Sequence, residues 1–199
     1  MTNSNLVMLI CLAGVLSAAC QRSEVEPKKA QSVASAPVYK AEPQPTETEL
    51  REAIKRNYEE VVTIDNSQST YFVTGDFNAD GSEDVAVVVK PAPGKLAELN
   101  SEYVNWILED PQVSAGEKKP RTAAITRDDL LLAVVHGYSR AGWRNPSAKQ
   151  TYLVKNAVAK EFAAQEDPLR KGAVIREKLR GSDGVIYWTG AKYAWRPVG

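Results

Sequence analysis

The chain has 199 residues, of which 25 are basic and 25 acidic, so its formal net charge at pH 7 is zero. This balance gives no electrostatic basis for binding nucleic acid, which is drawn to strongly basic surfaces. Hydrophobic residues make up 43% of the chain, enough to build a sizeable core in one domain.

The first 19 residues have the features of a signal peptide. An apolar run from Leu6 to Ala19 ends in small residues, as at a cleavage site. The run is shorter than the roughly 20 apolar residues that a transmembrane helix needs. We therefore predict that residues 1–19 are a signal peptide that leads the chain out of the cytoplasm.

The segment Leu16-Ser17-Ala18-Ala19-Cys20 resembles the lipobox of bacterial lipoproteins. The resemblance implies cleavage before Cys20, a lipid on this cysteine, and attachment to the cell-envelope membrane through that lipid. The next residue is Gln21 rather than an aspartate, which by the same resemblance implies the outer membrane, facing the periplasm, in a Gram-negative cell. The alternative is ordinary secretion with cleavage near Ala19.

The cysteine count follows from this assignment. Cys11 leaves with the signal peptide and Cys20 carries the lipid, so the rest of the mature chain contains no thiol. A disulfide, a thiolate metal site and a cysteine nucleophile are therefore excluded. Residues 20–45 are rich in Ser, Ala, Pro, Lys and Glu, and we predict that they form a flexible tether between the membrane and one globular domain, 46–199.

The globular domain is expected to begin with a helix. Thr46 can cap it, and Glu49 three residues later completes a capping box. Apolar residues then recur at the spacing of one buried stripe, at Leu50, Ala53, Ile54, Tyr58, Val61 and Val62. This pattern predicts an amphipathic helix packed on a sheet.

The stretch from Asp76 to Asp84 has the spacing of a calcium loop. Oxygen side chains occupy loop positions one, three, five and nine, and a glycine occupies position six. Calcium takes about 6 to 8 oxygen ligands in a flexible cage, and a backbone carbonyl at position seven supplies another. The predicted ligands are the side chains of Asp76, Asn78, Asp80 and Asp84 and the carbonyl of Ser82.

This loop differs from an EF-hand, because position twelve is Val87 instead of a glutamate and no helices flank it. The segment Gly75-Asp76-Phe77-Asn78-Ala79-Asp80-Gly81-Ser82-Glu83-Asp84 resembles instead the calcium loop of FG-GAP repeats, of the integrin α type. The resemblance implies bound calcium between two strands. It covers one copy only, so the propeller fold of that family, which needs typically 4 to 8 blades, is not implied. The alternative is a polar turn that binds no ion.

Two β-rich runs flank the loop, Thr70–Thr74 and Val85–Val89, and predict a hairpin with the loop at its tip. Val85–Val89 and Leu130–Val135 are apolar at every position, which is typical of central strands covered on both faces. The spacing of apolar residues from Leu96 to Ile107 predicts a second helix, and the polar segment from Asp110 to Arg121 predicts a loop.

The C-terminal part is expected to be mainly β-structure. Thr151–Val154 and Gly172–Ile175 are strand-like, whereas Ala157–Gln165 is compatible with a short helix. A turn is expected at Gly181–Gly184, with a strand following to Trp188.

A second turn in this part, a type II′ turn at Gly190-Ala191, fixes the register of the last hairpin. It pairs Trp188 with Tyr193 and Ile186 with Trp195, which puts these four side chains on one core face.

The sequence offers few candidate catalytic residues. His136 is the chain's one histidine and ends an apolar strand, so a hydrogen-bonded structural role is the favoured interpretation. Asp128 and Asp129 are adjacent and would point to opposite faces of a strand. Glu109 and Asp110 are expected at the end of the second helix, where negative charge is unfavourable.

Aromatic residues provide a candidate binding surface. Tyr138, Trp143 and Arg144 lie in a segment with glycine and proline, where loops place ligand-binding side chains. We interpret them as a possible platform for a sugar or a protein partner. The alternative is that Trp143 folds back over the edge of the sheet.

Together these patterns predict an α+β fold: an N-terminal amphipathic helix packed on a mostly antiparallel sheet, with a calcium-loop hairpin. The expected function is that of a membrane-anchored cell-envelope lipoprotein with a structural calcium ion and a non-enzymatic binding role. Its partner is an unidentified envelope component or protein. The alternative is a calcium-dependent envelope hydrolase.

Overall fold

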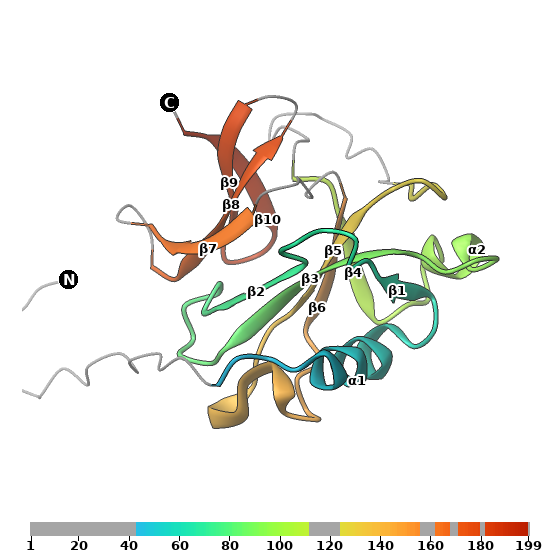
Figure 1. The fold of residues 1–199 in the computed structure, drawn as a ribbon, viewed down its shortest axis with the longest axis horizontal. Coiled ribbons are helices and arrows are strands. Elements are labelled where there is room, and N and C mark those ends of the chain that lie inside the picture. The colour runs from blue at the N-terminus through green and yellow to red at the C-terminus, as the bar shows by residue number, and fades with distance from the viewer. Residues whose placement is uncertain (1–42, 112–123, 156–161, 168–170, 180–181, 199) are drawn as a thin grey trace, which may run out of the picture. The chain divides into compact units, whose positions relative to one another are not determined.

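A computed structural model describes residues 43–111, 124–155, 162–167, 171–179 and 182–198. In these residues the fold is mixed α and β, with two sheets whose strand pairs are antiparallel except one, and few helices (Figure 1). The mixed α and β content and the antiparallel sheets agree with the sequence prediction. The predicted signal peptide, Cys20, most of the tether and residues 112–121 of the predicted loop lie outside the described residues.

The first helix, α1, runs from Glu47 to Tyr58. Its predicted capping box is confirmed, because the Thr46 hydroxyl accepts from the Glu49 N–H while the Glu49 carboxylate accepts from the Thr46 N–H. Leu50 and Tyr58 are fully buried, and the Tyr58 hydroxyl donates to the carbonyls of Val134 and Tyr152 at 2.8 Å each. The polar end of this tyrosine is therefore satisfied deep in the interior.

Six strands form the larger sheet, in the order β1-β3-β5-β6-β4 with β2 also paired to β3. They are β1 (Val62–Ile64), β2 (Phe72–Gly75), β3 (Asp84–Pro91), β4 (Trp106–Glu109), β5 (Leu131–Val135) and β6 (Thr151–Lys155). The predicted central position of the two all-apolar runs is confirmed, since β3 and β5 pair with each other inside the sheet.

Each face of this sheet has its own apolar core. Val85, Val87 and Val89 of β3 belong to the cluster that includes residues of α1, while Ala86 and Val88 belong to the cluster on the other face. Successive side chains of a strand point to opposite faces, so a strand covered on both sides needs apolar residues throughout.

The predicted second helix is largely wrong. Helix α2 spans only Leu96–Leu99, and the chain then enters β4, which pairs in parallel with β6. Trp106 is buried while Ile107 is half exposed, the alternation of a strand with one covered face. Glu109 consequently ends a strand rather than a helix. The apolar residues of this short segment fit the spacing of a helix as well as that of a strand, and the pairing with β6 makes it a strand.

A smaller sheet of four strands occupies the C-terminal part, in the order β10-β9-β8-β7. Its strands are β7 (Phe162–Glu166), β8 (Ala173–Leu179), β9 (Ser182–Trp188) and β10 (Tyr193–Pro197). The short helix considered for Ala157–Gln165 is wrong from residue 162 onward, where β7 pairs with β8. The turn predicted at Gly181–Gly184 is wrong for residues 182–184, which belong to β9, where Ser182 pairs with Leu179 of β8; Gly181 lies outside the described residues.

The register predicted for the last hairpin is confirmed. Tyr193 pairs with Trp188 and Trp195 with Ile186 around Gly190, whose φ is +96°. Positive φ at the first central residue of a two-residue loop is the conformation that favours glycine. Ile186 and Tyr193 are buried, and the two tryptophans pack against the same cluster.

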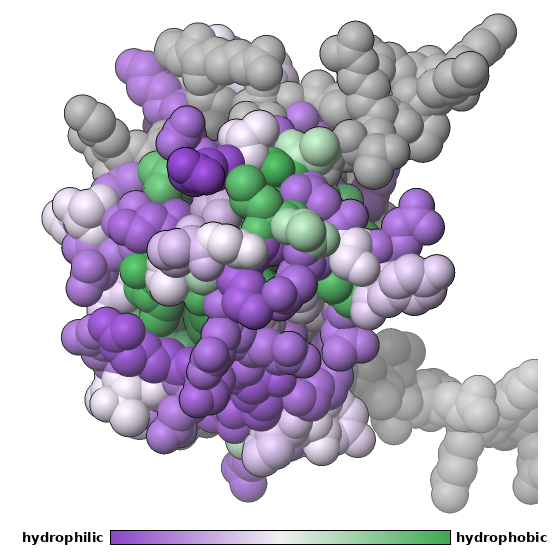
Figure 2. All heavy atoms as spheres, turned by 90° about the vertical axis from the view of Figure 1, so that its right-hand side faces the viewer, coloured by the Kyte–Doolittle hydropathy of each residue, from purple (hydrophilic) through white to green (hydrophobic). Residues whose placement is uncertain are grey.

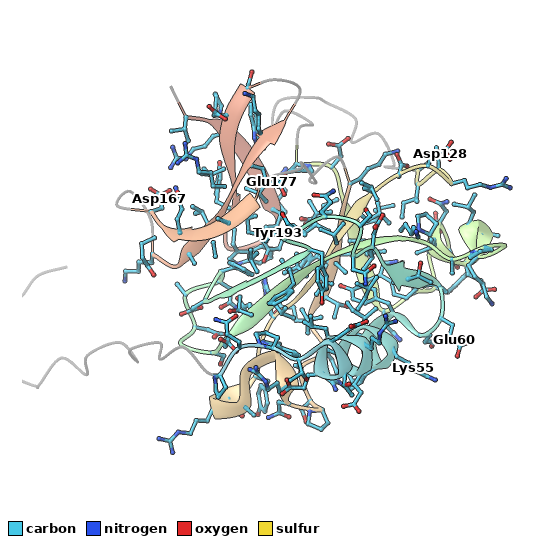
Figure 3. All side chains as sticks on the ribbon, viewed as in Figure 1. Lys55, Glu60, Asp128, Asp167, Glu177 and Tyr193 are labelled. Atoms are coloured by element: carbon cyan, nitrogen blue, oxygen red, sulfur yellow. The ribbon has the colours of Figure 1, made fainter. Side chains whose placement is uncertain are left out.

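The two sheets share one apolar cluster. It combines residues of β3, β5 and β6 with residues of β8, β9 and β10, and Figure 3 shows Tyr193 on the side of β10 that faces the larger sheet. None of the helices in the described ranges is long and apolar enough to span a bilayer.

Candidate functional site

The predicted calcium loop lies at the tip of the β2–β3 hairpin. Gly75 of β2 pairs with Asp84 of β3, so residues 76–83 form the connection between two hydrogen-bonded strand ends. The hairpin predicted from the two β-rich runs is confirmed, although β2 begins at Phe72 rather than at Thr70. Any group held by this loop therefore sits where the two strands meet.

The polar side chains of the loop turn inward. Asp76 accepts from the N–H groups of Asp80 at 3.0 Å and Gly81 at 2.9 Å. Asn78 Oδ1 accepts from the Asp80 N–H at 3.1 Å, and Asp80 Oδ1 accepts from the Ser82 N–H at 2.7 Å. These oxygens therefore face the loop's own backbone, although Asp80 itself remains exposed to solvent.

Asp84 is the most enclosed of the predicted ligands, with no exposed surface. One of its carboxylate oxygens accepts from the N–H groups of Phe77 at 2.7 Å and Asn78 at 3.3 Å, and the other accepts from the Gly137 N–H at 2.6 Å. Burial raises its pKa well above the usual value, and the charges of Asp80 and Asp76 raise it further.

The pKa of Asp76 is also raised. Burial raises the pKa of its carboxyl, as does the nearby charge of Asp80, against the lowering effect of the backbone N–H groups. The charge of Asp80 thus disfavours the ionised forms of both Asp76 and Asp84. A bound dication would reverse that repulsion, since opposite charge favours the ionised form.

Donor chemistry gives a test of whether calcium fits here. The Asn78 amide nitrogen donates to Asp80 Oδ2 at 2.9 Å and to His136 Nδ1 at 3.3 Å, which turns its oxygen toward the inside of the loop. All predicted ligands are hard oxygens, the type that calcium prefers. Within the ranges that the structure covers, however, no three or more His, Cys, Asp or Glu side chains are arranged as a ready metal site.

The loop also contacts the smaller sheet, which the sequence analysis did not anticipate. The Ala173 N–H donates to the Asp76 carbonyl at 2.7 Å. Gly172 has a φ of +85°, and a Cβ added to it would lie 2.8 Å from the same carbonyl. The sequence signal was the glycine at the start of β8, which marks a close approach of two backbones.

His136 has the structural role that the sequence favoured. It is 1% exposed, and its Nε2 lies 2.7 Å from the Tyr193 hydroxyl. Burial lowers its pKa to about 4, so the ring is neutral at pH 7. Since Nδ1 accepts from Asn78, Nε2 carries the proton and donates to Tyr193. A chain of hydrogen bonds thus joins the loop to β10.

The predicted aromatic platform is wrong for Trp143, which is fully buried. Its segment, the 3₁₀ helix η1 (Ser139–Arg144), packs back on the loop, because the Trp143 indole N–H donates to the Glu83 carboxylate at 3.0 Å. Its main-chain N–H donates to the Glu83 carbonyl at 2.7 Å. Trp143 therefore folds back onto the protein, as in the alternative interpretation, instead of forming an exposed platform. Tyr138 remains 59% exposed.

Arg144 is likewise occupied by structural contacts. Its guanidinium donates to Glu83 at 2.7 Å, to Glu49 at 2.9 Å and to the Pro43 carbonyl at 2.7 Å, and it stacks 4.3 Å from the Trp143 ring. Glu83, buried to 4% exposure, was missed by the sequence analysis because it lies between two predicted ligands without being one. It ties η1 to the loop.

Two glycines allow that contact. A Cβ on Gly137 would lie 2.2 Å from the Glu83 carbonyl oxygen, and one on Gly142 would lie 2.5 Å from it. No side chain fits at such distances. The loop is therefore enclosed on one side by η1 and on the other by the start of β8.

Comparison of the chain with family models, with curated proteins and with solved structures gives no match.

Proposed function

We propose that this protein is a cell-envelope lipoprotein, anchored through lipid on Cys20, in which calcium bound at residues 76–84 has a structural role. Its function is non-enzymatic: binding an envelope component or another protein, outside the cytoplasm. In this proposal the amphipathic helix α1 packs on the larger sheet, whose β2–β3 hairpin carries the ion. The observation that carries it is the set of inward-facing loop oxygens at the hairpin tip.

The ion would be held by Asp76, Asn78, Asp80 and Asp84 together with the Ser82 carbonyl. It would supply charge neutralisation, because burial and the neighbouring acidic charges raise the pKa of both Asp76 and Asp84. The loop is bonded to η1 and to β8, so a loop held in one conformation would also support those contacts. These relations make a structural effect on the whole domain the expected consequence of binding.

Calcium is therefore expected to raise the melting temperature. At a free calcium concentration about 100 times the dissociation constant, binding contributes about 2.7 kcal/mol of stability. For a domain of this size that corresponds to a shift of roughly 5 to 10 °C. Thermal melting followed by circular dichroism, in excess calcium and in excess chelator, measures it.

Asp80→Ala should melt at one temperature in both solutions, since it removes an exposed carboxylate from the ligand set. Asp128→Ala is the matched control, an exposed aspartate outside the loop, and should keep the full calcium shift. If the wild-type protein melted at the same temperature with calcium and with chelator, the proposal that this loop binds calcium would be wrong.

Lipid attachment gives a separate test of the anchoring part. Cells grown with radioactive palmitate should label the wild-type protein and leave Cys20→Ser unlabelled, because the thiol of Cys20 is the predicted acceptor. The label should fractionate with the outer membrane. Secretion of an unlabelled wild-type chain into the soluble fraction would favour cleavage near Ala19 instead.

The alternative function, a calcium-dependent envelope hydrolase, requires carboxylates from separate segments to meet in a cleft beside the ion. A cavity of about 370 Å³ lies between α1 and β1, and none of the loop residues lines it. Two titratable residues at this place, Glu83 within the loop and His136 bonded to it, are buried in structural contacts. The engagement of His136 and Glu83 in structural contacts supports the non-enzymatic proposal.

A further inference from the structure

Asn78 is the only asparagine among the predicted calcium ligands, and its side chain has two different ends. The amide oxygen can bind calcium, whereas the amide nitrogen is a donor and cannot. The carboxylates of Asp76, Asp80 and Asp84 have two equivalent oxygens and present a ligand whichever way they turn. The orientation of the Asn78 amide therefore decides whether this residue contributes to the site.

Contacts within the loop fix this orientation only in part. Asn78 Nδ2 donates to Asp80 Oδ2 at 2.9 Å, and Asn78 Oδ1 accepts from the Asp80 N–H at 3.1 Å. Asp80 is exposed and is itself a predicted ligand, so its carboxylate would be drawn to the ion and away from the amide. Asn78 Nδ2 then depends on an acceptor from outside the loop.

That acceptor is His136, which directly follows β5. Its Nδ1 lies 3.3 Å from Asn78 Nδ2, and its Nε2 lies 2.7 Å from the Tyr193 hydroxyl of β10. Because an amide nitrogen only donates, Nδ1 accepts and the ring proton is on Nε2. The bond that one ring nitrogen makes sets the state of the other. Tyr193 therefore keeps Nδ1 available to accept from Asn78.

The His136 ring is held firmly in this position. Its main-chain N–H donates to the Gln150 carbonyl at 2.9 Å. The ring centroids of Tyr152 and Trp188 lie 5.0 Å from its own, and that of Tyr193 lies 5.8 Å away. His136 is 1% exposed, unlike the hydrophobic residues that emerge between hydrophilic ones on the face in Figure 2. A ring packed on all sides cannot turn away from the loop.

We propose that His136 is a positioning residue for calcium, which through Nδ1 keeps Asn78 Oδ1 directed into the loop, while Tyr193 keeps the proton on Nε2. This inference rests on the proposed calcium role of the loop. It makes the affinity for the ion depend on a residue that does not touch the ion, and on β10 of the smaller sheet. Loss of such an outer partner lowers metal affinity by about 10- to 100-fold in other proteins.

Two substitutions of His136 separate this role from packing. His136→Leu and His136→Asn remove the same part of the ring and leave side chains of nearly the same shape. The asparagine keeps an acceptor oxygen near the position of Nδ1, and the leucine has none. The calcium dissociation constant should stay near the wild-type value in His136→Asn and rise about tenfold in His136→Leu. Isothermal titration of the full-length protein in detergent with calcium chloride measures both.

A merely structural role would give the opposite order of the two variants. A buried amide in apolar surroundings costs stability that leucine does not, so His136→Asn should melt below His136→Leu in chelator and yet bind calcium more tightly. Equal dissociation constants for the two variants, with the wild type still binding, would overturn the inference and leave the proposed ion in place. No binding heat from the wild type would overturn both.

Asn78→Asp tests the amide itself. A carboxylate presents an oxygen in either orientation, so His136→Leu should change the calcium affinity of this background by less than about twofold. If His136→Leu cost as much affinity here as it does beside Asn78, orientation of the amide would not be its effect, and the inference would be wrong.

The position of the ring proton is a test that needs no substitution. His136 is the chain's one histidine, so a proton–nitrogen correlation NMR spectrum of the tag-free full-length protein reports its ring alone. The proton is expected on Nε2. A proton on Nδ1 would contradict the proposal, because that nitrogen could not then accept from Asn78.

Discussion

Arg144→Met is expected to destabilise the protein by about 3 to 5 kcal/mol, the usual cost of removing one partner from a buried ion pair. The Glu83 side chain is 3% exposed, and the Arg144 guanidinium 2.7 Å away supplies its positive counter-charge. The same substitution removes the bond to Glu49 at the start of α1 and the bond to the Pro43 carbonyl. Chemical denaturation of wild type and variant measures the difference.

Lys95→Met is the matched control, because it removes the cation of an ion pair that is exposed. The side chains of Lys95 and Glu98 are 39% and 54% exposed, and solvent screening leaves such exposed pairs little effect on stability. If Arg144 were a ligand-binding residue without a structural role, its removal would leave stability near that of the control. A loss below about 1 kcal/mol for Arg144→Met would therefore contradict the structural assignment.

A second large effect is expected at Glu177, a buried carboxyl on the inner face of the smaller sheet (Figure 3). It is 2% exposed, and neither of its carboxyl oxygens has a hydrogen-bond partner in the described structure. Gly184 lies opposite it in β9, where the unpaired indole nitrogen of Trp195 fills the space that a side chain would take. Burial alone raises the pKa of Glu177 to about 9.

The sign of the pH effect follows from this shift. The folded state holds the proton up to about pH 9, while the unfolded chain releases it near pH 4.5, so the unfolded state binds fewer protons between these values. Stability therefore falls as pH rises through this window, and below pH 4.5 the penalty is absent. Between pH 5 and pH 8.5 the change amounts to roughly 4 kcal/mol.

Glu177→Gln should abolish that pH dependence, because the amide does not titrate. The stability difference between variant and wild type should thus move in favour of the variant by roughly 4 kcal/mol from pH 5 to pH 8.5. Glu166→Gln, an exposed position on β7, is the control and should leave the wild-type profile unchanged. A constant difference between Glu177→Gln and wild type across this range would show that the carboxyl ionises freely.

Local signals predicted several parts of the fold and of the candidate site. The capping box at Thr46 and Glu49 and the two-residue turn at Gly190 depend on bonds within a few residues, so the sequence alone was sufficient. The hairpin of β2 and β3 was predicted from the two β-rich runs that flank the loop, for the same reason. Continuous apolar runs identified β3 and β5 as central strands, because only a strand covered on both faces requires them.

Long-range contacts decided the rest. Arg144 bonds to Glu83 and Glu49, which lie 61 and 95 residues away from it in the chain. No rule of sequence spacing connects residues so far apart. The sequence predicts a loop at Trp143, but the side chain belongs to the core, where its indole N–H donates to Glu83, 60 residues away in the chain.

The same holds for β4, whose short apolar segment suits a helix or a strand until β6 supplies its main-chain partners. The sequence by itself determined the local hydrogen bonds, those within one helical turn or one hairpin. The tertiary structure decided which side chains are buried. The physical reason is that burial and strand pairing depend on neighbours that only the folded chain brings together.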